Sequence, residues 1–541
     1  MASGSTEVTA VHPDTIASVH WWLVRMPFAA DILWGSGRRS GTTRAIVRLE
    51  TADGTVGWGE TIALIDTVPA VLGAIAAKVA VGRSIRDAEG FHRHVLGAGY
   101  YHHKRAAVMA TAAVEMAMWD ALGRRAGLPL WALWGGLWRA RVEASAYLVV
   151  GDPGIVAEEA RRFLDAGHET FKNKIGVSAG SDVPLVEAVR RVVGARDVRA
   201  DVNGAWTPGT AKRQLAKLAP FDLAYVEQPL ELDDLQGHAE LRRAQPVPIA
   251  LDESAYTLAD VGNIVRAGAA DVVLLDPHEA GGLWQVVKQA AICESVGIPV
   301  TLHSGGELAL SQAAYVHLAA SIPNMGLAID TEQTYLAGDI APDGPRLARG
   351  GFAVPDRPGL GVTPDPGLIE RHRVSEISGA DLDPDRPGWF PVKPAYGGTG
   401  AGPARLNSRA SPAMVRRSER PDRARPIQIC PPSATTPVSP SPSGARPGRP
   451  ATSSRPTPPT RARNSTCWKC SPIPRGASTW ATCATTRWAT CSRATSGPRV
   501  SRCSIPWAGT PSACRPRTRR CRTRCIRANG PTPTSRRCAR S

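Results

Sequence analysis

The alternation of apolar and polar residues divides the chain into an opening sheet, a group of helices and a long series of strand–helix repeats. Residues 16–26 and 44–60 alternate as strands do, and Asp53-Gly54 in the second segment favours a tight hairpin turn. Three helical patterns follow, at about 68–81, 85–97 and 104–126. Residues 1–140 therefore predict an α+β domain, with strands first and helices after.

From about residue 141, short β-rich runs alternate with amphipathic helices. The runs are SAYLVV, TFKNKIGV, VRADVNGAW, LAYVEQPL, PIALDES, DVVLLDP and PVTLHSGG. This repetition indicates parallel strands with crossover helices, and the number of units suits a closed (β/α)₈ barrel better than an open sheet. We expect the barrel at 141–345, a capping domain at 1–140 and a segment returning to the cap at 346–394. No glycine-rich nucleotide-binding loop opens any unit.

The pattern stops at about residue 395. The whole chain carries a formal charge of +17, but residues 401–541 hold 27 Arg, 1 Lys and two acidic residues, so the first 400 residues have a net charge of −9. The tail, 395–541, is rich in Pro, Arg, Ser, Thr and Cys and has neither helical nor strand periodicity. It is expected to be disordered, or to be out-of-frame translation of a GC-rich gene, which is the interpretation we favour.

The tail also admits a functional interpretation. An Arg-rich segment attracts phosphate without sequence specificity, so it could associate with nucleic acid, although we regard this as the weaker hypothesis. The CWKC run at 467–470 lacks a second suitably spaced pair and a histidine, which weakens the case for a metal module.

The distribution of cysteines and apolar residues bears on location. Ten of the 11 cysteines lie in the tail and Cys293 stands alone in the front part, which points to a reducing compartment. We see no signal peptide at the N-terminus and no apolar run of about 18 residues, the length that a membrane span needs. A cytoplasmic protein that does not contact membranes is the expectation.

Polar residues end or follow the apolar runs, where the carboxyl ends of parallel strands meet at one mouth of a barrel. They are Lys172, Lys174, Asp201, Asn203, Glu227, Asp252, Glu253, Asp276 and His303. Asp201, Glu227 and Asp252 come from successive strands at intervals of 26 and 25 residues. Three neighbouring carboxylates repel one another unless a cation lies among them, and an all-oxygen set favours Mg²⁺, or Mn²⁺, over Zn²⁺.

Two further pairs suggest acid–base chemistry. Lys172 and Lys174 lie two apart on a strand, so both project to the same face. Two ammonium groups that lie near each other and near a divalent cation lower each other's pKa. A lysine needs such a lowered pKa to act as a base near neutral pH. Asp276 and His303 end consecutive strands, and we expect a hydrogen bond that orients the imidazole as a second acid or base across the cavity.

At this point the segments FKNKIG, DVNGAW, VEQP, LDES, LLDPHEAGG and LHSGGE together resemble the enolase superfamily, in its mandelate racemase and acid-sugar dehydratase branch. The resemblance covers about residues 16–375. It implies that Asp201, Glu227 and Asp252 bind magnesium, with Glu253 as the alternative third ligand.

The same resemblance implies roles for the other residues. Lys174 would be one base, Lys172 would help neutralise the substrate carboxylate, and the Asp276–His303 dyad would be the second acid or base. The muconate cycloisomerase and dipeptide epimerase branches carry a second lysine where this chain has Asp276, which argues against them. The expected substrate contacts are Asn203, Arg38, and either Asp330 or Glu332 as the counterpart of the family's substrate-binding glutamate.

The predicted chemistry begins with a carboxylate α-proton, which is very weakly acidic. Both carboxylate oxygens must therefore be held by the cation and Lys172 before the proton can leave. A protonated His303 could then donate to a departing β-hydroxyl, giving dehydration to an enol and then a 2-keto acid. Return of the proton to the opposite face would instead give racemisation or epimerisation.

Substrate choice depends on the capping domain. The glycine-rich segment 27–41 is expected to fold over the mouth as a lid, where Arg38 and Arg39 could hold a distal carboxylate. Our first hypothesis is an acid-sugar dehydratase for a small-molecule carboxylate such as glucarate or galactarate. The alternatives are a racemase or epimerase of a 2-hydroxy or amino acid and, from another class, nucleic-acid association through the tail. Relatives of this kind commonly form homo-oligomers.

Overall fold

The computed structural model describes residues 12–34, 37–63, 66–149 and 151–377, which belong to one compact unit, Met1–Arg420. The predictions for the tail, 395–541, and for residues 378–394 fall outside the described part of the chain. Among the described helices, none is both long and apolar enough to cross a membrane.

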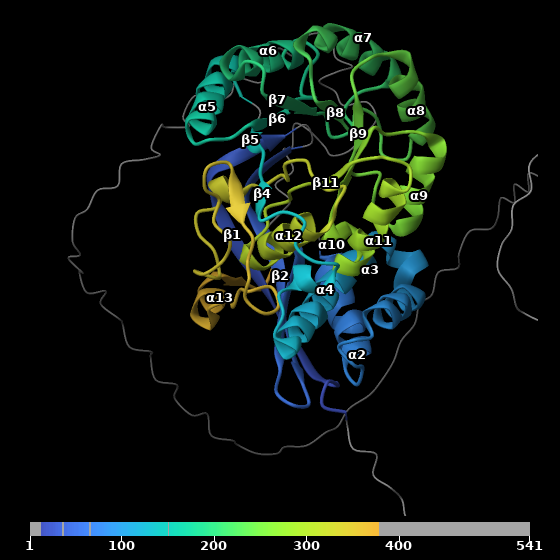
Figure 1. The fold of residues 1–541 in the computed structure, drawn as a ribbon, viewed down its shortest axis with the longest axis vertical. Coiled ribbons are helices and arrows are strands. Elements are labelled where there is room, and N and C mark those ends of the chain that lie inside the picture. The colour runs from blue at the N-terminus through green and yellow to red at the C-terminus, as the bar shows by residue number, and fades with distance from the viewer. Residues whose placement is uncertain (1–11, 35–36, 64–65, 150, 378–541) are drawn as a thin grey trace, which may run out of the picture. The chain divides into compact units, whose positions relative to one another are not determined.

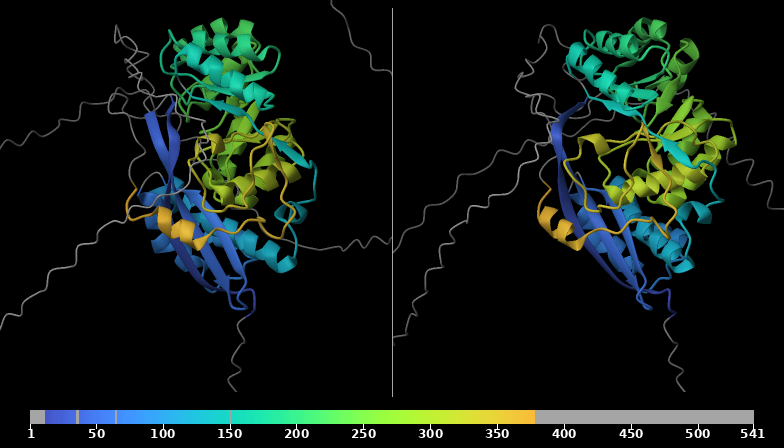
Figure 2. Two further views of the ribbon diagram at one scale, coloured as in Figure 1. Left: turned by 90° about the vertical axis from the view of Figure 1, so that its left-hand side faces the viewer. Right: turned by 60° about the vertical axis from the view of Figure 1, so that its left-hand side comes forward.

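The capping domain is built on a four-stranded antiparallel sheet (Figure 2). Its strands are β1 (Ile16–Trp34), β2 (Gly37–Thr51), β3 (Val56–Ile62) and β13 (Arg373–Val374). The sheet order is β13-β1-β2-β3, so the edge strand β13 comes from the far end of the described chain, after helix α13 (Pro366–His372). The segment that follows the barrel therefore returns to the cap.

Helices cover this sheet and complete the cap. They are α1 (Thr67–Val71), the π-helical turn η1 (Leu72–Ala76), α2 (Ala77–Ala80), α3 (Ala88–Ala126) and α4 (Leu130–Leu133). The prediction of separate helices at 85–97 and 104–126 is wrong, because α3 is one continuous helix of 39 residues. Gly97 in its interior costs about 1 kcal/mol of helix stability. Burial of α3 side chains such as Phe91 and Val114 against the sheet outweighs that cost.

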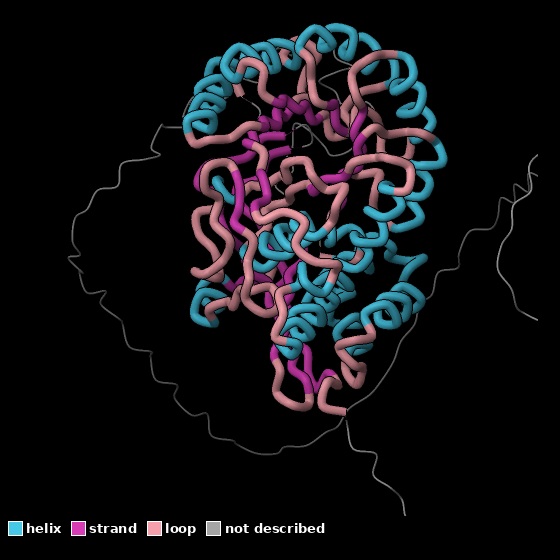
Figure 3. The backbone as a smooth tube through the Cα atoms, viewed as in Figure 1, coloured by secondary structure: helices cyan, strands magenta, loops and turns pink. Residues whose placement is uncertain are grey.

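The barrel consists of parallel strands surrounded by helices (Figures 1 and 3). The strands are β5 (Ala146–Leu148), β6 (Thr170–Lys174), β7 (Asp197–Asp201), β8 (Tyr225–Glu227), β9 (Ile249–Leu251), β10 (Val272–Leu275) and β11 (Val300–Leu302). The helices that follow them are α5 (Pro153–Asp165), α6 (Asp182–Val193), α7 (Pro208–Leu218), α8 (Leu235–Ala244), α9 (Leu258–Ala267), α11 (Leu283–Glu294) and α12 (Ala309–Ser321). A short helix, α10 (Pro277–Ala280), and the 3₁₀ turns η2 (Ala219–Phe221) and η3 (Gln333–Tyr335) lie in the connections. A separate ribbon pairs β4 (Arg141–Glu143) with β12 (Gly351–Ala353).

An eighth, very short segment closes the barrel between β11 and β5. The amide of Asp330 donates to the carbonyl of Leu302 at 2.9 Å, and the amide of Ser145 donates to the carbonyl of Ile329 at 2.8 Å. The ladder of seven paired strands is therefore continued on both sides by residues 329–330. The predicted (β/α)₈ barrel with an N-terminal capping domain is confirmed.

The barrel helices α5, α7, α8 and α9 carry their own N-terminal side-chain caps, whereas α6, α11 and α12 do not. Asp152, Thr207, Asp234 and Thr257 accept hydrogen bonds from the first-turn amides of α5, α7, α8 and α9. The first amides of α11 instead donate to Glu115 of α3. At the start of α12, the amides of Leu308 and Ser311 donate to Glu60 of β3, and the amide of Ala309 between them donates to Asp339. Buried carboxylates of the cap thus satisfy amides that would otherwise lack partners at the helix N-termini.

The expected lid, residues 27–41, is largely the outer end of the β1–β2 hairpin. The two strands remain paired from Ile32–Arg39 to Trp34–Gly37 beyond an irregularity that starts at Pro27. Gly41 serves this close approach, because a Cβ atom there would lie 2.6 Å from the carbonyl oxygen of Met26. The glycine that suggested a loose loop therefore allows two strands to pack closely.

We predict that Glu115→Ala lowers the free energy of unfolding by about 2–4 kcal/mol, because the amides of Leu283 and Trp284 would lose their acceptor in a buried place. Urea denaturation at pH 7 measures this change. Glu187→Ala is the control, since its ion pair with Arg191 is exposed and its removal should change stability by less than about 0.5 kcal/mol. Equal effects of the two substitutions would contradict the capping role.

The Glu115 carboxyl also predicts a pH dependence. Burial raises the pKa of Glu115 to about 7, and its N–H donors only partly oppose this shift. Because the pKa of Glu115 is raised in the folded state, the protonated carboxyl contributes fully to the free energy of unfolding below about pH 4.5. This contribution is lost as the pH rises through 7. We expect the stability of the wild type relative to Glu115→Gln to fall by up to about 3 kcal/mol between pH 4.5 and 8. A constant difference over this range would show that the pKa is not raised.

Candidate active site

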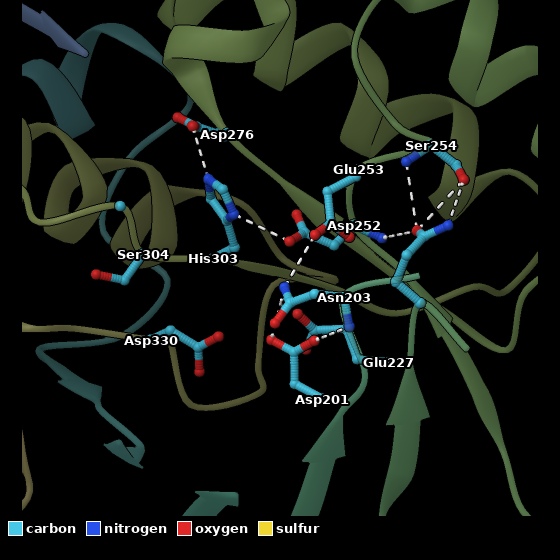
Figure 4. A network of polar contacts seen from close by, with 12 residues as sticks. Asp201, Asn203, Glu227, Asp252, Glu253, Ser254, Asp276, His303, Ser304 and Asp330 are labelled. Atoms are coloured by element: carbon cyan, nitrogen blue, oxygen red, sulfur yellow. Dashed lines mark hydrogen bonds and ion pairs between the residues drawn. The ribbon is translucent and has the colours of Figure 1, made fainter. Parts of the chain in front are cut away.

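The residues predicted for the site lie at the carboxyl ends of successive barrel strands (Figure 4). Lys172 and Lys174 belong to β6, Asp201 ends β7, Glu227 ends β8, and Asp252, Asp276 and His303 directly follow β9, β10 and β11. The strand register explains their common level, because Lys174 is paired with Asp201, and Asp201 with Glu227, across adjacent strands. Almost all of these side chains are buried.

Lys172 is the centre of a buried charge cluster. Its Nζ lies 2.6 Å from Oε1 of Glu227, 2.6 Å from Oδ2 of Asp330 and 3.2 Å from Oδ2 of Asp201. Lys174 Nζ also donates to Asp201, and lies 3.1 Å from Oδ1 of Asn203. The two ammonium groups thus supply the positive charge among carboxylates from three strands.

The carboxylates around the two lysines raise their pKa values, whereas the sequence analysis expected a neighbouring ammonium group and a divalent cation to lower them. Burial is the largest single effect and by itself would lower the pKa of Lys172 and of Lys174, but Asp201 and the other acidic groups around them together outweigh burial and raise both pKa values above the ordinary value. Asp330 and Glu227 raise the pKa of Lys172 further. The sequence analysis weighed the repulsion between two neighbouring lysines and missed the closer attraction to these carboxylates.

The imidazole of His303 lies between two carboxylates. Its Nε2 is 2.7 Å from Oδ2 of Asp276, the contact that we expected, and its Nδ1 is 3.0 Å from Oδ2 of Asp252. A carboxylate can only accept, so an imidazole that bonds both must donate from both nitrogens and carry a positive charge. In agreement, burial would lower the pKa of His303, but Asp252 and Asp276 together raise it by more, so that it lies well above its usual value.

The second oxygen of Asp276 is also held. Oδ1 accepts from the amide of His278 at 2.8 Å and from the hydroxyl of Tyr315 at 2.9 Å. Tyr315 lies inside helix α12, whose residues are all buried, and there it resembles an ordinary core residue. No sequence signal distinguished it, because its role comes from the packing of α12 against the end of β10.

The carboxylates at this mouth fit a divalent cation with oxygen ligands. Oε2 of Glu227 and Oε2 of Glu253 are buried and have no hydrogen-bond partner among the described residues. Burial and the neighbouring Asp201 raise the pKa of Glu227 well above its usual value, and burial and Asp252 raise that of Glu253 to about 7. Carboxyl groups that cannot all ionise together, with oxygens left unpaired, are what a bound cation would relieve.

We expected the candidate metal ligands to lie together around one point, but in the structure they divide into two groups. Among the described residues, the acidic and histidine side chains whose ligand atoms all lie within 4.8 Å of one another are Asp252, Glu279 and His303. Asp201 and Glu227 instead meet at Lys172. Glu253, the alternative third ligand, points toward the same region and accepts a hydrogen bond from Asn203 at 2.9 Å. Both Asp252 and Glu253 therefore remain candidates for the third ligand.

The expected substrate contacts take different positions. Asn203 lies in the cluster and has the left-handed backbone conformation, with φ of 48°. Asp330 accepts from Lys172 and from the hydroxyl of Ser145 at 2.5 Å, and Glu332 forms an ion pair with Arg39. The side chain of Arg38 lies outside the described part of the structure.

The Arg39–Glu332 pair changes the picture of the lid. Arg39 was expected to hold a distal carboxylate of the substrate, but Glu332, which is fully buried, already neutralises it. The lid nevertheless reaches the mouth. Phe28 and Ile32 of the hairpin pack with Tyr147 and Tyr335 in one buried apolar cluster.

Tyr147 is a residue of the mouth that the sequence analysis overlooked. Its ring centre lies 5.2 Å from Nζ of Lys174 and 5.9 Å from Nζ of Lys172, within the range of cation–π attraction. The tyrosine stands in the run SAYLVV, which is the first strand of the predicted barrel. Its place near a strand end could have identified it by the same positional rule as the other residues.

The fold and the site together define a (β/α)₈-barrel enzyme whose acid–base groups and candidate metal ligands lie at one mouth beneath a capping domain. Comparison with family models agrees. Residues 24–135 match the mandelate racemase / muconate lactonizing enzyme N-terminal domain, and residues 155–368 match the enolase C-terminal domain-like family. The chain belongs to the enolase superfamily, in its mandelate racemase / muconate lactonizing enzyme branch.

Individual relatives catalyse different reactions. A probable glucarate dehydratase from Streptomyces coelicolor is 31% identical to this chain, over 64% of this chain and 86% of the dehydratase. An N-succinyl-L-Arg/Lys racemase from Bacillus cereus is 27% identical, over 64% of this chain and 95% of the racemase. The dipeptide epimerase from Enterococcus faecalis, complexed with Mg and the dipeptide L-Leu-L-Tyr, superimposes with a TM-score of 0.61 at 26% identity over 64% of this chain and 99% of its own.

We predict that Glu227→Gln weakens Mg²⁺ binding by at least about 10–100-fold, because it replaces a fully buried candidate carboxylate ligand with a neutral amide. Isothermal titration calorimetry of the full chain with Mg²⁺ measures the affinity without any substrate. Asp197→Asn is the matched control, since Asp197 is exposed at the opposite end of β7. Unchanged affinity in Glu227→Gln would remove this residue from the ligand set.

Proposed function

We propose that the protein is a magnesium-dependent dehydratase of an acid sugar, an aldonate or an aldarate, which it converts into a 2-keto acid. The observation that carries this proposal is the imidazole of His303, held by carboxylates at both nitrogens and located on the other side of the mouth from Lys174. An acid and a base on separate sides of one cavity suit removal of an α-proton and loss of a β-hydroxyl. The dehydratase among the relatives supports the reaction class.

The chain's own groups divide this reaction between them. Asp201, Glu227 and either Asp252 or Glu253 would hold the magnesium ion, which when bound stabilises negative charge developing on the substrate carboxylate. Lys172, which is fully buried, places a positive charge beside the same region and would complement that carboxylate. Lys174 would take the α-proton on Nζ in its neutral form, after its contact with Asp201 has loosened and its ammonium group has lost a proton to solvent.

His303 would act as the acid toward the departing hydroxyl. Asp276 holds Nε2, so Nδ1, on the side of Asp252, is the atom that would deliver the proton. Asp276 is itself fixed by His278 and Tyr315, which keeps the imidazole in one orientation. Delivery of this proton to the β-oxygen, with cleavage of the carbon–oxygen bond, gives water and an enol that becomes the 2-keto acid.

The polar lining of the mouth supports the proposed substrate class. Asn203 and the carboxyl of Glu253 offer hydrogen-bonding groups to a polyhydroxylated chain. The argument for a diacid has become weaker than that for an aldonate, because Arg39 is paired with Glu332. We therefore include both mono- and diacids in the proposal.

The second candidate is a racemase or epimerase of a 2-hydroxy or amino acid. It is favoured by the same two-sided arrangement, since His303 could return a proton to the face opposite Lys174, and by the racemase among the relatives. The two reactions differ in whether a β-hydroxyl leaves. Product analysis therefore separates them.

A library of aldonates and aldarates incubated with the full chain and Mg²⁺ should yield a 2-keto acid, detected as its semicarbazone. Solvent deuterium in the recovered acid, measured in D₂O, reports α-proton removal without elimination. Deuterium exchange with no keto acid would favour the racemase. Neither signal with any acid sugar would overturn the proposed substrate class.

His303→Asn should lower the rate of keto acid formation by at least about 100-fold, because the acid that protonates the leaving hydroxyl is lost. The steady-state kcat on the substrate found in the library measures this effect. His20→Asn, at an exposed position on β1, is the control and should retain wild-type kcat. A near-normal kcat for His303→Asn would mean that another group is the acid.

A further inference from the structure

A buried ion pair of the capping domain lies directly behind the segment that carries His303. Nε of Arg44 on β2 donates to Oε1 of Glu60 on β3 at 2.7 Å, and both side chains are fully buried. Burying such a pair costs free energy unless further hydrogen bonds satisfy its remaining atoms. Here the further bonds all go to the barrel.

Glu60 caps the helix that follows His303. Its Oε1 accepts from the amide of Leu308 at 2.9 Å and its Oε2 from the amide of Ser311 at 3.0 Å. Leu308 is the N-cap residue of α12 and Ser311 lies in its first turn, and the N-cap side chain makes no capping hydrogen bond. The negative charge at a helix N-terminus is also favourable electrostatically. A residue of the cap therefore holds two amides at the start of α12 and the end of the loop 303–308, while Asp339 accepts from the amide of Ala309 between them.

Arg44 holds both loops that carry the dyad. Nη1 donates to the carbonyl of Gly305 at 3.3 Å, two residues after His303, and Nη2 lies 2.8 Å from Nε2 of His278, two residues after Asp276. A guanidinium has no acceptor, so Nε2 of His278 must accept and this imidazole must be neutral. The amide of His278 in turn donates to Asp276.

The loop 303–308 has little freedom between these contacts. The carboxyl of Glu307 accepts from the hydroxyl of Ser304 and the amide of Gly305, both at 2.6 Å. Gly306 has a positive φ of 80°, and a Cβ atom there would lie 2.9 Å from Cβ of Thr42 on β2. The loop is thus pressed against the same cap strand that carries Arg44.

We propose that Arg44 and Glu60 are positioning residues for His303, which hold its loop and the start of α12 so that the imidazole faces the substrate opposite Lys174. Neither residue touches the site itself, and the role rests on the proposed function of His303 as an acid. The capping domain then contributes to the chemical step as well as to substrate enclosure. A displacement of the order of 1 Å in such a group can lower a rate on the order of 100-fold.

The first test needs no substrate. Amide hydrogen exchange of the full chain, read by mass spectrometry, should be faster at residues 303–311 in Glu60→Gln and Arg44→Met than in the wild type. Asp120→Asn is the matched control, because Asp120 is a buried carboxylate of α3 that accepts from Trp58 and Leu360 instead. Unchanged exchange at 303–311 in both variants would overturn the proposal, whatever reaction the enzyme catalyses.

The second test asks whether the positioning matters to the chemistry. In D₂O, Glu60→Gln and Arg44→Met should lower keto acid formation on the order of 100-fold while α-proton exchange in the recovered substrate falls much less, because Lys174 is unaffected. The ratio of exchange to elimination should therefore rise. A general loss of folding would lower both rates together, and Asp120→Asn should leave the ratio unchanged.

The outcomes separate the two proposals. An unchanged ratio in Glu60→Gln and Arg44→Met overturns the positioning role even where total activity falls. If the wild type converts no acid sugar, the proposed function fails, and amide exchange at 303–311 still decides whether the pair holds the loop. Faster amide exchange together with a raised ratio supports both.

Discussion

The structure depends on the compensation of buried charge at the mouth of the barrel. Carboxylates from β7 and β8 and from the segment closing the barrel lie within hydrogen-bonding distance of Lys172, in a place from which water is almost excluded. Removing Lys172, the cation that these carboxylates share, would leave uncompensated negative charge in a medium of low polarity, a cost of about 3–5 kcal/mol. Such an arrangement adds little net stability, so its presence at the strand ends points to chemistry more than to folding.

The capping domain meets a second requirement, which is to hold the loops of the barrel in place. Helices α11 and α12 follow the loops that carry Asp276 and His303, and both begin without caps of their own. Glu115 and Glu60 provide these caps from the other domain. The two domains are therefore joined by hydrogen bonds that end next to the acid–base dyad, so that their packing and the geometry of the site depend on each other.

Much of the fold and many of the site residues could be predicted from the sequence, for a physical reason. Parallel strands are buried on both faces, so their ends are marked by an abrupt change from apolar to polar residues, and this change located Lys174, Asp201 and Glu227. The pairing of Asp276 with His303 followed from adjacent strands. Local pattern could not reveal that α3 runs unbroken through Gly97, because that depends on burial against the sheet.

The partners of the charged groups were harder to predict, since they depend on distances between side chains far apart in the chain. Arg39 and Glu332 are separated by 293 residues, and Arg44 and His278 by 234. Sequence spacing showed that cations and anions would meet at the mouth, but not which would pair. For that reason the pKa of Lys174 was expected to fall, whereas its contact with Asp201 raises it.

That contact limits how the site can work. Lys174 must be neutral to accept a proton, yet the carboxylate that favours its charged form is also a candidate magnesium ligand. The Lys174 ammonium and a magnesium ion could not bind the Asp201 carboxylate independently, because any binding free energy that one of them gains from Asp201 the other loses. His303 is under no such conflict, since Asp252 and Asp276 both favour the protonated form that an acid needs. The asymmetry between a lysine that must be released and a histidine that is already charged is the reason that we propose elimination ahead of racemisation.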